Sequence, residues 1–151
     1  MIKQVRKVVC YAVQQDHLLV FTHNAVPMEI TGVQVPAGTV RPGEEPADAA
    51  VRELREETGV AGKVRRYLGE SVYDLRPLRP ETATRYFFQL EVPASSVSAR
   101  WGAGEPDPDD GGSPVSWTCW WMPLPQAHVL AGGLGARLGD LAEDPAVLPS
   151  T

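Results

Sequence analysis

The sequence has little cysteine, little histidine and no long hydrophobic run. Its two cysteines and three histidines are scattered without the spacing of a zinc site. No apolar run approaches the length of a membrane span, and the N-terminal residues lack the pattern of a signal peptide. We therefore expect a cytoplasmic protein in which Cys10 and Cys119 are buried thiols rather than a disulfide.

Positive charge is also scarce. The chain has 14 lysines and arginines against 19 aspartates and glutamates, which gives a net charge of −5. A generally acidic surface argues against broad binding to nucleic acid or to a membrane. An anionic substrate would need metal ions or a local basic patch to offset the repulsion. The length of 151 residues and the apolar fraction of 43% are typical of a single globular domain, expected over residues 1–151.

The most informative stretch runs from Gly38 to Val60 and contains a predicted helix. Pro46 suits the first helical position, and Gly59 suits the residue just past the helix end. One face of this helix is a small apolar stripe that can pack on a sheet. The residues of the stripe are Ala47, Val51, Leu54 and Thr58.

Three glutamates crowd another face of the helix. Glu53, Glu56 and Glu57 stand at positions i, i+3 and i+4, so their side chains share that face. Like charges at this spacing repel, and a bound divalent cation would remove the repulsion. Without a cation, the carboxylates would tend to hold protons, because each raises the pKa of its neighbours. Magnesium and manganese take the oxygen ligands that such a cluster offers.

The same stretch resembles the Nudix box. That motif reads Gly, five residues, Glu, seven residues, Arg-Glu, an aliphatic residue, any residue, Glu-Glu, any residue, Gly and an aliphatic residue. The matching positions here, all with the correct spacing, are Gly38, Glu44, Arg52, Glu53, Leu54, Glu56, Glu57, Gly59 and Val60. The resemblance covers the box closely, whereas outside it only the order of predicted elements agrees. The alternative interpretation is an amphipathic surface helix with a solvated acidic face.

The predicted elements favour an α/β protein, and the resemblance implies the Nudix fold, a mixed β-sheet sandwiched between α-helices. Residues 93–114 are rich in Pro, Gly, Ser, Ala and Asp, which predicts a mobile loop, and the C-terminal tail is expected to fray. Strands are predicted at residues 7–13, 17–21, 32–35, 63–75, 82–92 and 115–122, and short helices at 125–131 and 134–141.

The resemblance also implies a function, which is metal-dependent hydrolysis of a P–O–P linkage in a nucleoside diphosphate derivative. It implies magnesium, or alternatively manganese, held by Glu56 and Glu57, with the Gly38 carbonyl as a further candidate ligand. Glu53 is either a third ligand or the base that takes a proton from the attacking water. The resemblance places Arg52 beside these acids to hold a glutamate in position. We therefore expect Glu53, Arg52 and Glu57 to carry the catalysis.

Three further residues are candidates for the site. Glu44 either assists the metal site, holds the loop, or is an acid favoured near the start of the helix by the helix dipole. Arg85 is a candidate contact for a substrate phosphate, with a solvent-exposed role as the alternative. Many relatives add a carboxylate from a distant loop, although such acids can also only solvate a loop. The acids of the long loop here are Glu105, Asp107, Asp109 and Asp110.

Two other functions stay open at this point. A nucleotide-sensing regulatory module would bind without turnover, but pure binding does not need three clustered glutamates. A diphosphate isomerase shares the fold but needs proton-transfer groups outside the box, and no convincing cysteine–glutamate pair is placed for it. The expected partner is a small nucleoside diphosphate derivative that the sequence does not identify. Family members often form homodimers, and the sequence leaves the oligomeric state open.

Overall fold

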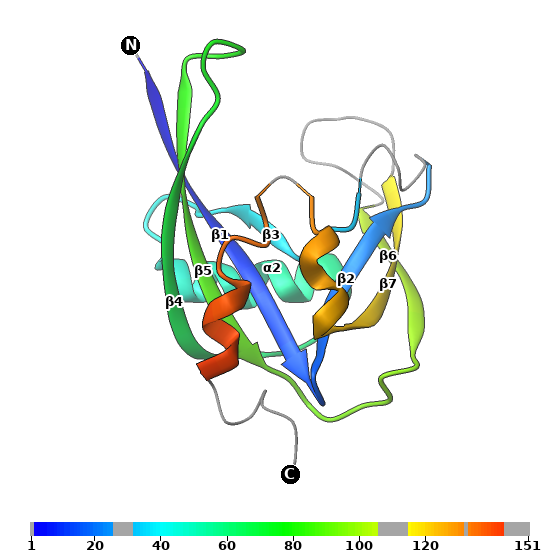
Figure 1. Cartoon of the computed structure of the whole chain (residues 1–151). Coiled ribbons are helices and arrows are strands. Elements are labelled where there is room, and N and C mark those ends of the chain that lie inside the picture. The colour runs from blue at the N-terminus through cyan, green and yellow to red at the C-terminus, as the bar shows by residue number, and fades with distance from the viewer. Residues whose placement is uncertain (1, 26–31, 106–114, 132, 144–151) are drawn as a thin grey trace.

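A computed structural model describes residues 2–25, 32–105, 115–131 and 133–143 (Figure 1). Its strands are β1 (Lys3–Gln14), β2 (His17–His23), β3 (Ala37–Thr39), β4 (Lys63–Asp74), β5 (Glu81–Glu91), β6 (Arg100–Glu105) and β7 (Val115–Pro123). The helices are α2 (Pro46–Thr58) and the 3-10 helices η1 (Leu124–Val129) and η2 (Leu138–Glu143). Among the described helices, none is long and apolar enough to cross a membrane.

The strands form a mixed sheet in the order β4-β5-β1-β2-β7-β6, and β3 pairs with β1. β1 runs parallel to β5, whereas it is antiparallel to β2 and β3. β1 and β2 pair only where Val13 meets Leu18 and Gln14 meets His17, so the two strands then diverge. Figure 1 shows this divergence, and β3 lies along β1 on the open side. The opening between the strands is where the predicted active-site stretch enters the sheet.

β1 is buried on both faces, because successive side chains of a strand point to opposite sides of the sheet. Val8, Cys10 and Ala12 belong to one core cluster, and Val9 and Tyr11 belong to another. The first cluster packs against α2 and the second against the C-terminal segment, which Figure 1 shows on opposite sides of the sheet. The α2 residues of the first cluster are Ala49, Ala50 and Leu54. Cys10 and Cys119 are buried free thiols, as predicted.

The mixed sheet between helical layers agrees with the expected α/β fold, but the helices are fewer than expected. The predicted helices at 125–131 and 134–141 are replaced by η1 and η2, which have six residues each and are 3-10 helices. Gly132 and Gly133 separate the two segments, and runs this short rarely sustain an α-helix. α2 is therefore the only α-helix in the described ranges.

The strand predicted at residues 32–35 was also wrong. These residues make only isolated bridges, between Gln34 and Phe21 and between Val33 and Leu130. The continuous strand, β3, starts beyond Pro36, whose nitrogen has no hydrogen to donate to a ladder. The loop prediction for residues 93–114 was wrong in part, because Arg100–Glu105 form β6 and pair with β7. Residues 106–114 and the tail 144–151 lie outside the described residues.

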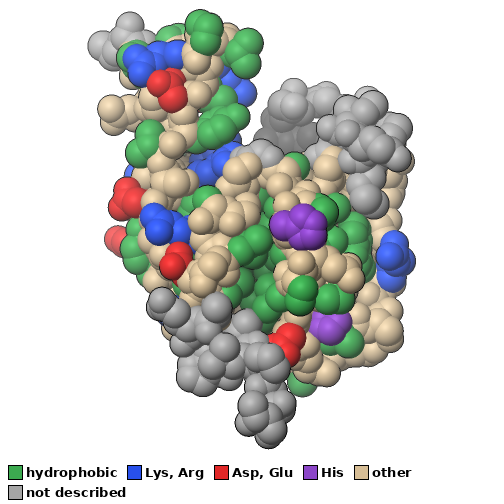
Figure 2. Space-filling model, viewed as in Figure 1, with side chains coloured by type: hydrophobic (Ala, Val, Ile, Leu, Met, Phe, Trp, Pro, Cys, Tyr) green, Lys and Arg blue, Asp and Glu red, His purple; other side chains and the backbone are tan. Residues whose placement is uncertain are grey.

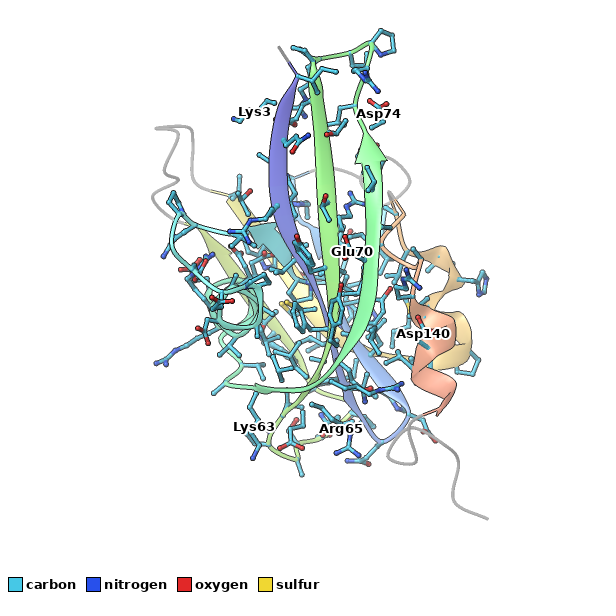
Figure 3. All side chains as sticks on the ribbon, turned by 90° about the vertical axis from the view of Figure 1, so that its left-hand side faces the viewer. Lys3, Lys63, Arg65, Glu70, Asp74 and Asp140 are labelled. Carbon is cyan, nitrogen blue, oxygen red and sulfur yellow. The ribbon has the colours of Figure 1, made fainter. Side chains whose placement is uncertain are left out.

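β4, β5 and the start of β1 project from the body as an arm (Figures 1 and 3). Figure 3 shows Lys3 and Asp74 near the tip of this arm, whereas Lys63 and Arg65 lie at the opposite end of β4. β4 is one bent strand with two irregularities in its pairing with β5. The 3-10 helix η2, which carries Asp140, lies beside it.

The packing of α2 on β1 predicts a large effect of truncating Leu54, whose side chain is fully buried. Leu54→Ala is expected to lower the free energy of unfolding by about 2–5 kcal/mol, because it leaves a cavity in the core. Arg55→Ala is the matched control, because Arg55 is exposed on the same helix. This variant loses only a favourable charge near the helix end, which contributes less than about 1 kcal/mol. Urea unfolding measures both, and equal small changes would contradict this account of the core.

Candidate active site

α2 begins at Pro46 and ends before Gly59, as its sequence predicts. Gly59 adopts φ 78°, a left-handed conformation that favours glycine, and its N–H donates to the carbonyl of Arg55. The Thr58 hydroxyl donates to the carbonyl of Leu54 at 2.6 Å. These bonds satisfy carbonyls that the helix end would otherwise leave without partners.

Two tryptophans from the sheet also hold the end of α2. The indole N–H of Trp117, on β7, donates to the carbonyl of Glu57 at 2.7 Å. The indole N–H of Trp101, on β6, donates to the carbonyl of Thr58 at 2.8 Å. The backbone that carries Glu57 is therefore fixed from both strands, and sequence analysis missed this role because it depends on contacts between distant segments.

Arg52 is the centre of the charge network. Its Nε and Nη2 donate to the two carboxylate oxygens of Glu44 at 2.8 and 2.9 Å. Its Nη1 donates to Glu53 at 2.7 Å and to Glu56 at 3.2 Å. Nη2 also donates to the carbonyl of Thr39 at 3.0 Å. Arg52 thus reaches across the helix to hold the glutamates, in the position that the sequence predicts.

Glu44 is the main anionic partner of Arg52. Hydrogen bonds from Arg52, and then from the backbone N–H of Arg41, lower the pKa of Glu44 to about 2. Glu44 precedes Glu45, the residue that caps the helix, and it closes the loop on itself through the 3.0 Å bond to Arg41. The geometry therefore makes Glu44 a residue that holds the loop and Arg52, rather than an acid that serves the helix dipole.

Glu57 is half-buried beside the start of β3. Its Oε1 accepts the backbone N–H of Ala37 at 3.2 Å. Burial, and then the hydrogen bond and charge of Glu53, raise the pKa of Glu57 well above its usual range. Glu53 is also buried, with 9% of its surface exposed. The charge of Glu53 thus opposes ionisation of Glu57, as expected for a carboxylate crowded by another one without a cation.

Gly38 brings β3 directly over Glu53. A Cβ atom at this position would lie 2.1 Å from Cδ of Glu53, which is far inside van der Waals contact. Only glycine therefore lets the strand and the carboxylate occupy their places. The resemblance to the Nudix box made the Gly38 carbonyl a candidate ligand, and the structure places Gly38 beside the acid cluster.

The donor set fits a hard divalent cation, since carboxylate oxygens are the ligands that magnesium and manganese prefer. Glu53, Glu56 and Glu57 would hold such an ion. Within the described ranges, no three acidic, histidine or cysteine side chains are already arranged as ligands of one ion. Arg52 instead engages oxygens of Glu53 and Glu56.

The acids line a cavity of about 820 Å³. The same cavity is lined by Phe21 and His23 of β2 and by Trp117 of β7, whose ring centroids lie 5.4–5.9 Å apart. Trp117 is a buried core residue that also borders this cavity. Phe21 and His23 are two positions apart on β2, so the alternation of side chains along a strand predicts that they share a face. It does not predict that this face borders the acids.

Other candidate residues from the sequence are Arg85 and the acids of the long loop. Arg85, on β5, lines a neighbouring cavity of about 390 Å³. Glu105 ends β6 opposite Val115, and both Val115 and Gly104 border the larger cavity. The acids Asp107, Asp109 and Asp110 lie outside the described residues.

The NUDIX domain family model matches residues 3–142, which span most of the chain and include the whole box. The chain therefore belongs to the Nudix family, as the resemblance implied.

Two relatives with similar segments are named for different activities. Human diphosphoinositol polyphosphate phosphohydrolase 2 is 45% identical over 56 residues, which are 37% of this chain and 29% of that protein. ADP-ribose pyrophosphatase of Bacillus subtilis (strain 168) is 54% identical over 37 residues, which are 24% of this chain and 20% of that protein. The chain thus spans under a third of the length of these relatives.

Solved structures confirm the fold over nearly the whole chain. A NUDIX hydrolase from Nitrosomonas europaea superposes with a TM-score of 0.64 at 18% identity, covering 99% of this chain and 98% of that one. The MutT NUDIX hydrolase from Burkholderia pseudomallei gives a TM-score of 0.64 at 17% identity, covering 91% and 97%.

The contact between Gly38 and Glu53 predicts that Gly38→Ala displaces the Glu53 carboxylate while the fold survives, because the end of a glutamate side chain can move. We expect affinity for Mn²⁺, measured by calorimetry, to fall about tenfold or more, as when a group that orients a metal ligand is lost. Gly102→Ala is the control, since Gly102 is in strand β6 with open space around its Cβ position. If both variants bind Mn²⁺ with equal affinity, Glu53 is not part of the metal site.

Proposed function

We propose that this chain is a hydrolase that uses a divalent metal ion to split the diphosphate linkage of a nucleoside diphosphate derivative. The observation that carries the proposal is the convergence of Glu53, Glu56 and Glu57 on a cavity of ligand size, where Arg52 holds Glu53 and Glu56. The named substrates of both relatives described above contain a diphosphate, which supports the same reaction class.

The reaction adds water across the P–O–P linkage. The water oxygen bonds to one phosphorus, the bridging oxygen leaves with the electron pair of the broken bond, and a proton of the water passes to a base. A bound magnesium or manganese ion would neutralise the diphosphate and lower the pKa of the attacking water. The protein itself supplies positioning and electrostatic stabilisation rather than covalent chemistry.

The family resemblance gives the proposed roles, and the contacts in the cluster are compatible with them. Glu56 and Glu57 are the ligands, and Glu57 accepts the N–H of Ala37. Glu53 is a third ligand or the base, and it is held by Arg52. Arg52 is a positioning residue, because its guanidinium is occupied by the glutamates and by Thr39.

The aromatic wall of the cavity fits the nucleoside end of the substrate. Phe21, His23 and Trp117 offer an apolar surface in the same cavity as the acids, and rings of this kind favour offset or edge contacts with another aromatic group. Magnesium as the preferred ion and a cytoplasmic location stay predictions from the sequence, which leaves open whether the protein forms a homodimer.

Glu56→Gln and Glu57→Gln are each expected to reduce turnover by about a hundredfold or more, because each removes a charged ligand. The assay is phosphate release from a panel of nucleotide diphosphates with Mg²⁺ or Mn²⁺, coupled to a phosphatase. Glu57→Gln should leave thermal stability at least unchanged, because it replaces a buried carboxylate with a neutral group of the same shape.

Glu45→Gln is the control for this pair. Glu45 is an exposed acid at the start of the same helix, and its side chain makes no capping hydrogen bond. Its turnover should equal that of the unmodified protein. Near-normal turnover in both Glu56→Gln and Glu57→Gln would exclude the proposed mechanism.

A further inference from the structure

Glu57 is held from two sides by segments that are distant from each other in the sequence. Its carboxylate accepts the backbone N–H of Ala37, the first residue of β3, at 3.2 Å. Its backbone carbonyl accepts the indole N–H of Trp117, on β7, at 2.7 Å. Because α2 ends at Thr58, the helix itself offers no donor to this carbonyl, and Trp117 supplies one. Glu57 also borders both the cavity of about 820 Å³ and the cavity of about 390 Å³.

The indole of Trp117 is itself fixed by β2. Trp117 and His23 are register partners in the antiparallel pairing of β7 with β2. Their ring centroids lie 5.6 Å apart, and the Phe21 ring lies 5.4 Å from the Trp117 ring. Only 6% of Trp117 is exposed, so the ring has little freedom to turn. The aromatic contacts therefore set the direction of the N–H on which the backbone of Glu57 depends.

Trp101 makes a bond of the same kind to a residue with a different role. Its indole N–H, from β6, donates to the carbonyl of Thr58 at 2.8 Å. Thr58 is a buried residue, and its hydroxyl is bonded to the carbonyl of Leu54. Trp101 is not among the described residues that line the two cavities at Glu57. The two tryptophans are thus alike in their bond and differ in the side chain that the bond positions.

Both tryptophans lie on the side of the sheet that α2 covers. Trp117 belongs to the core cluster beneath α2, and Trp101 packs against that cluster. Figure 2 views the molecule from the side that carries η1 and η2, where the acidic side chains are few and lie apart. The crowded carboxylates and the two indole bonds therefore occur together on the α2 side.

Loss of the Trp117 N–H would leave the carbonyl of Glu57 without its donor. A polar group that protein covers is costly when its partner is lost, so the helix end would move toward water or another donor. The carboxylate would move as well, because it belongs to the same residue as the carbonyl. Metal ligands tolerate little displacement, since a group that orients a ligand typically contributes about 10–100-fold to metal affinity or activity.

We propose that Trp117 is a positioning residue of the metal site. Its N–H holds the last turn of α2 where the Glu57 carboxylate takes the metal ion, and its ring forms part of the cavity wall. One side chain thereby joins the part of the cavity that contacts the substrate to the part that binds the metal. This inference rests on the proposed function, because it assigns a further residue to the same site.

The test removes the N–H and keeps the ring. Trp117→benzothienylalanine replaces the indole nitrogen with sulfur, and Trp101→benzothienylalanine is the matched comparison. Calorimetry should show that the affinity for Mn²⁺ falls about tenfold or more in the Trp117 variant and clearly less in the Trp101 variant. Each variant loses one hydrogen bond at the helix end, so the midpoints of thermal unfolding should fall by similar amounts. A merely structural role would change Mn²⁺ affinity alike in the two variants.

Turnover at saturating Mn²⁺ gives a second measure. The probe is the nucleotide that the unmodified protein hydrolyses fastest in the panel described above. We expect kcat of Trp117→benzothienylalanine to fall about tenfold or more with KM unchanged, because the ring that borders the cavity is kept. Trp117→Phe and Trp101→Phe repeat the comparison with natural residues, and the loss should again be larger at Trp117. Equal losses at both positions, or no loss at Trp117, would overturn the proposal.

A measurement without metal or substrate separates this proposal from the proposed function. The amide of Ala37 donates to the Glu57 carboxylate, so its NMR signal in EDTA reports where that carboxylate lies. If the unmodified protein binds no Mn²⁺ or cleaves no nucleotide, the proposed function fails. A shift of the Ala37 signal in the Trp117 variant but not in the Trp101 variant still supports the positioning role. An Ala37 signal that is unchanged in the Trp117 variant would overturn it.

Discussion

The structure of the acid cluster depends on the guanidinium of Arg52. This planar group joins the loop through Glu44, strand β3 through the Thr39 carbonyl, and helix α2 through Glu53. A lysine would present one compact charge and could not make these bonds in the same geometry. Three segments are thereby fixed relative to one another, and the repulsion among the glutamates is partly balanced before any ion binds.

The second constraint is the divergence of β1 and β2. Because these strands pair only at their connected ends, β3 can lie along β1 while Gln34 bridges to Phe21. Glu57 then meets the backbone of Ala37 at the meeting point of two cavities. Burial of α2 against the sheet places the carboxylate there, and the bond from Trp117 fixes the backbone that carries it.

The features of α2 that depend on neighbouring residues could be predicted from the sequence. The features that depend on pairing between distant segments could not. The helix limits and its acid face follow from spacing along one helix, and the resemblance to the Nudix box implied the reach of Arg52. β6 was missed because Gly102 and Gly104 give its sequence the composition of a loop, while its pairing with β7 is a tertiary property. The bond from Trp117 to the carbonyl of Glu57 likewise depends on the place of β7 in the sheet, which no local pattern encodes.

The acid cluster cannot by itself decide the substrate. The two relatives match this chain over 56 and 37 residues, yet their names give a polyphosphorylated inositol and ADP-ribose as substrates. A family that shares one box must therefore discriminate through residues beyond it. Here Glu57 borders both cavities, so the lining of either cavity can contact the groups that the diphosphate carries while the diphosphate itself lies at the acids.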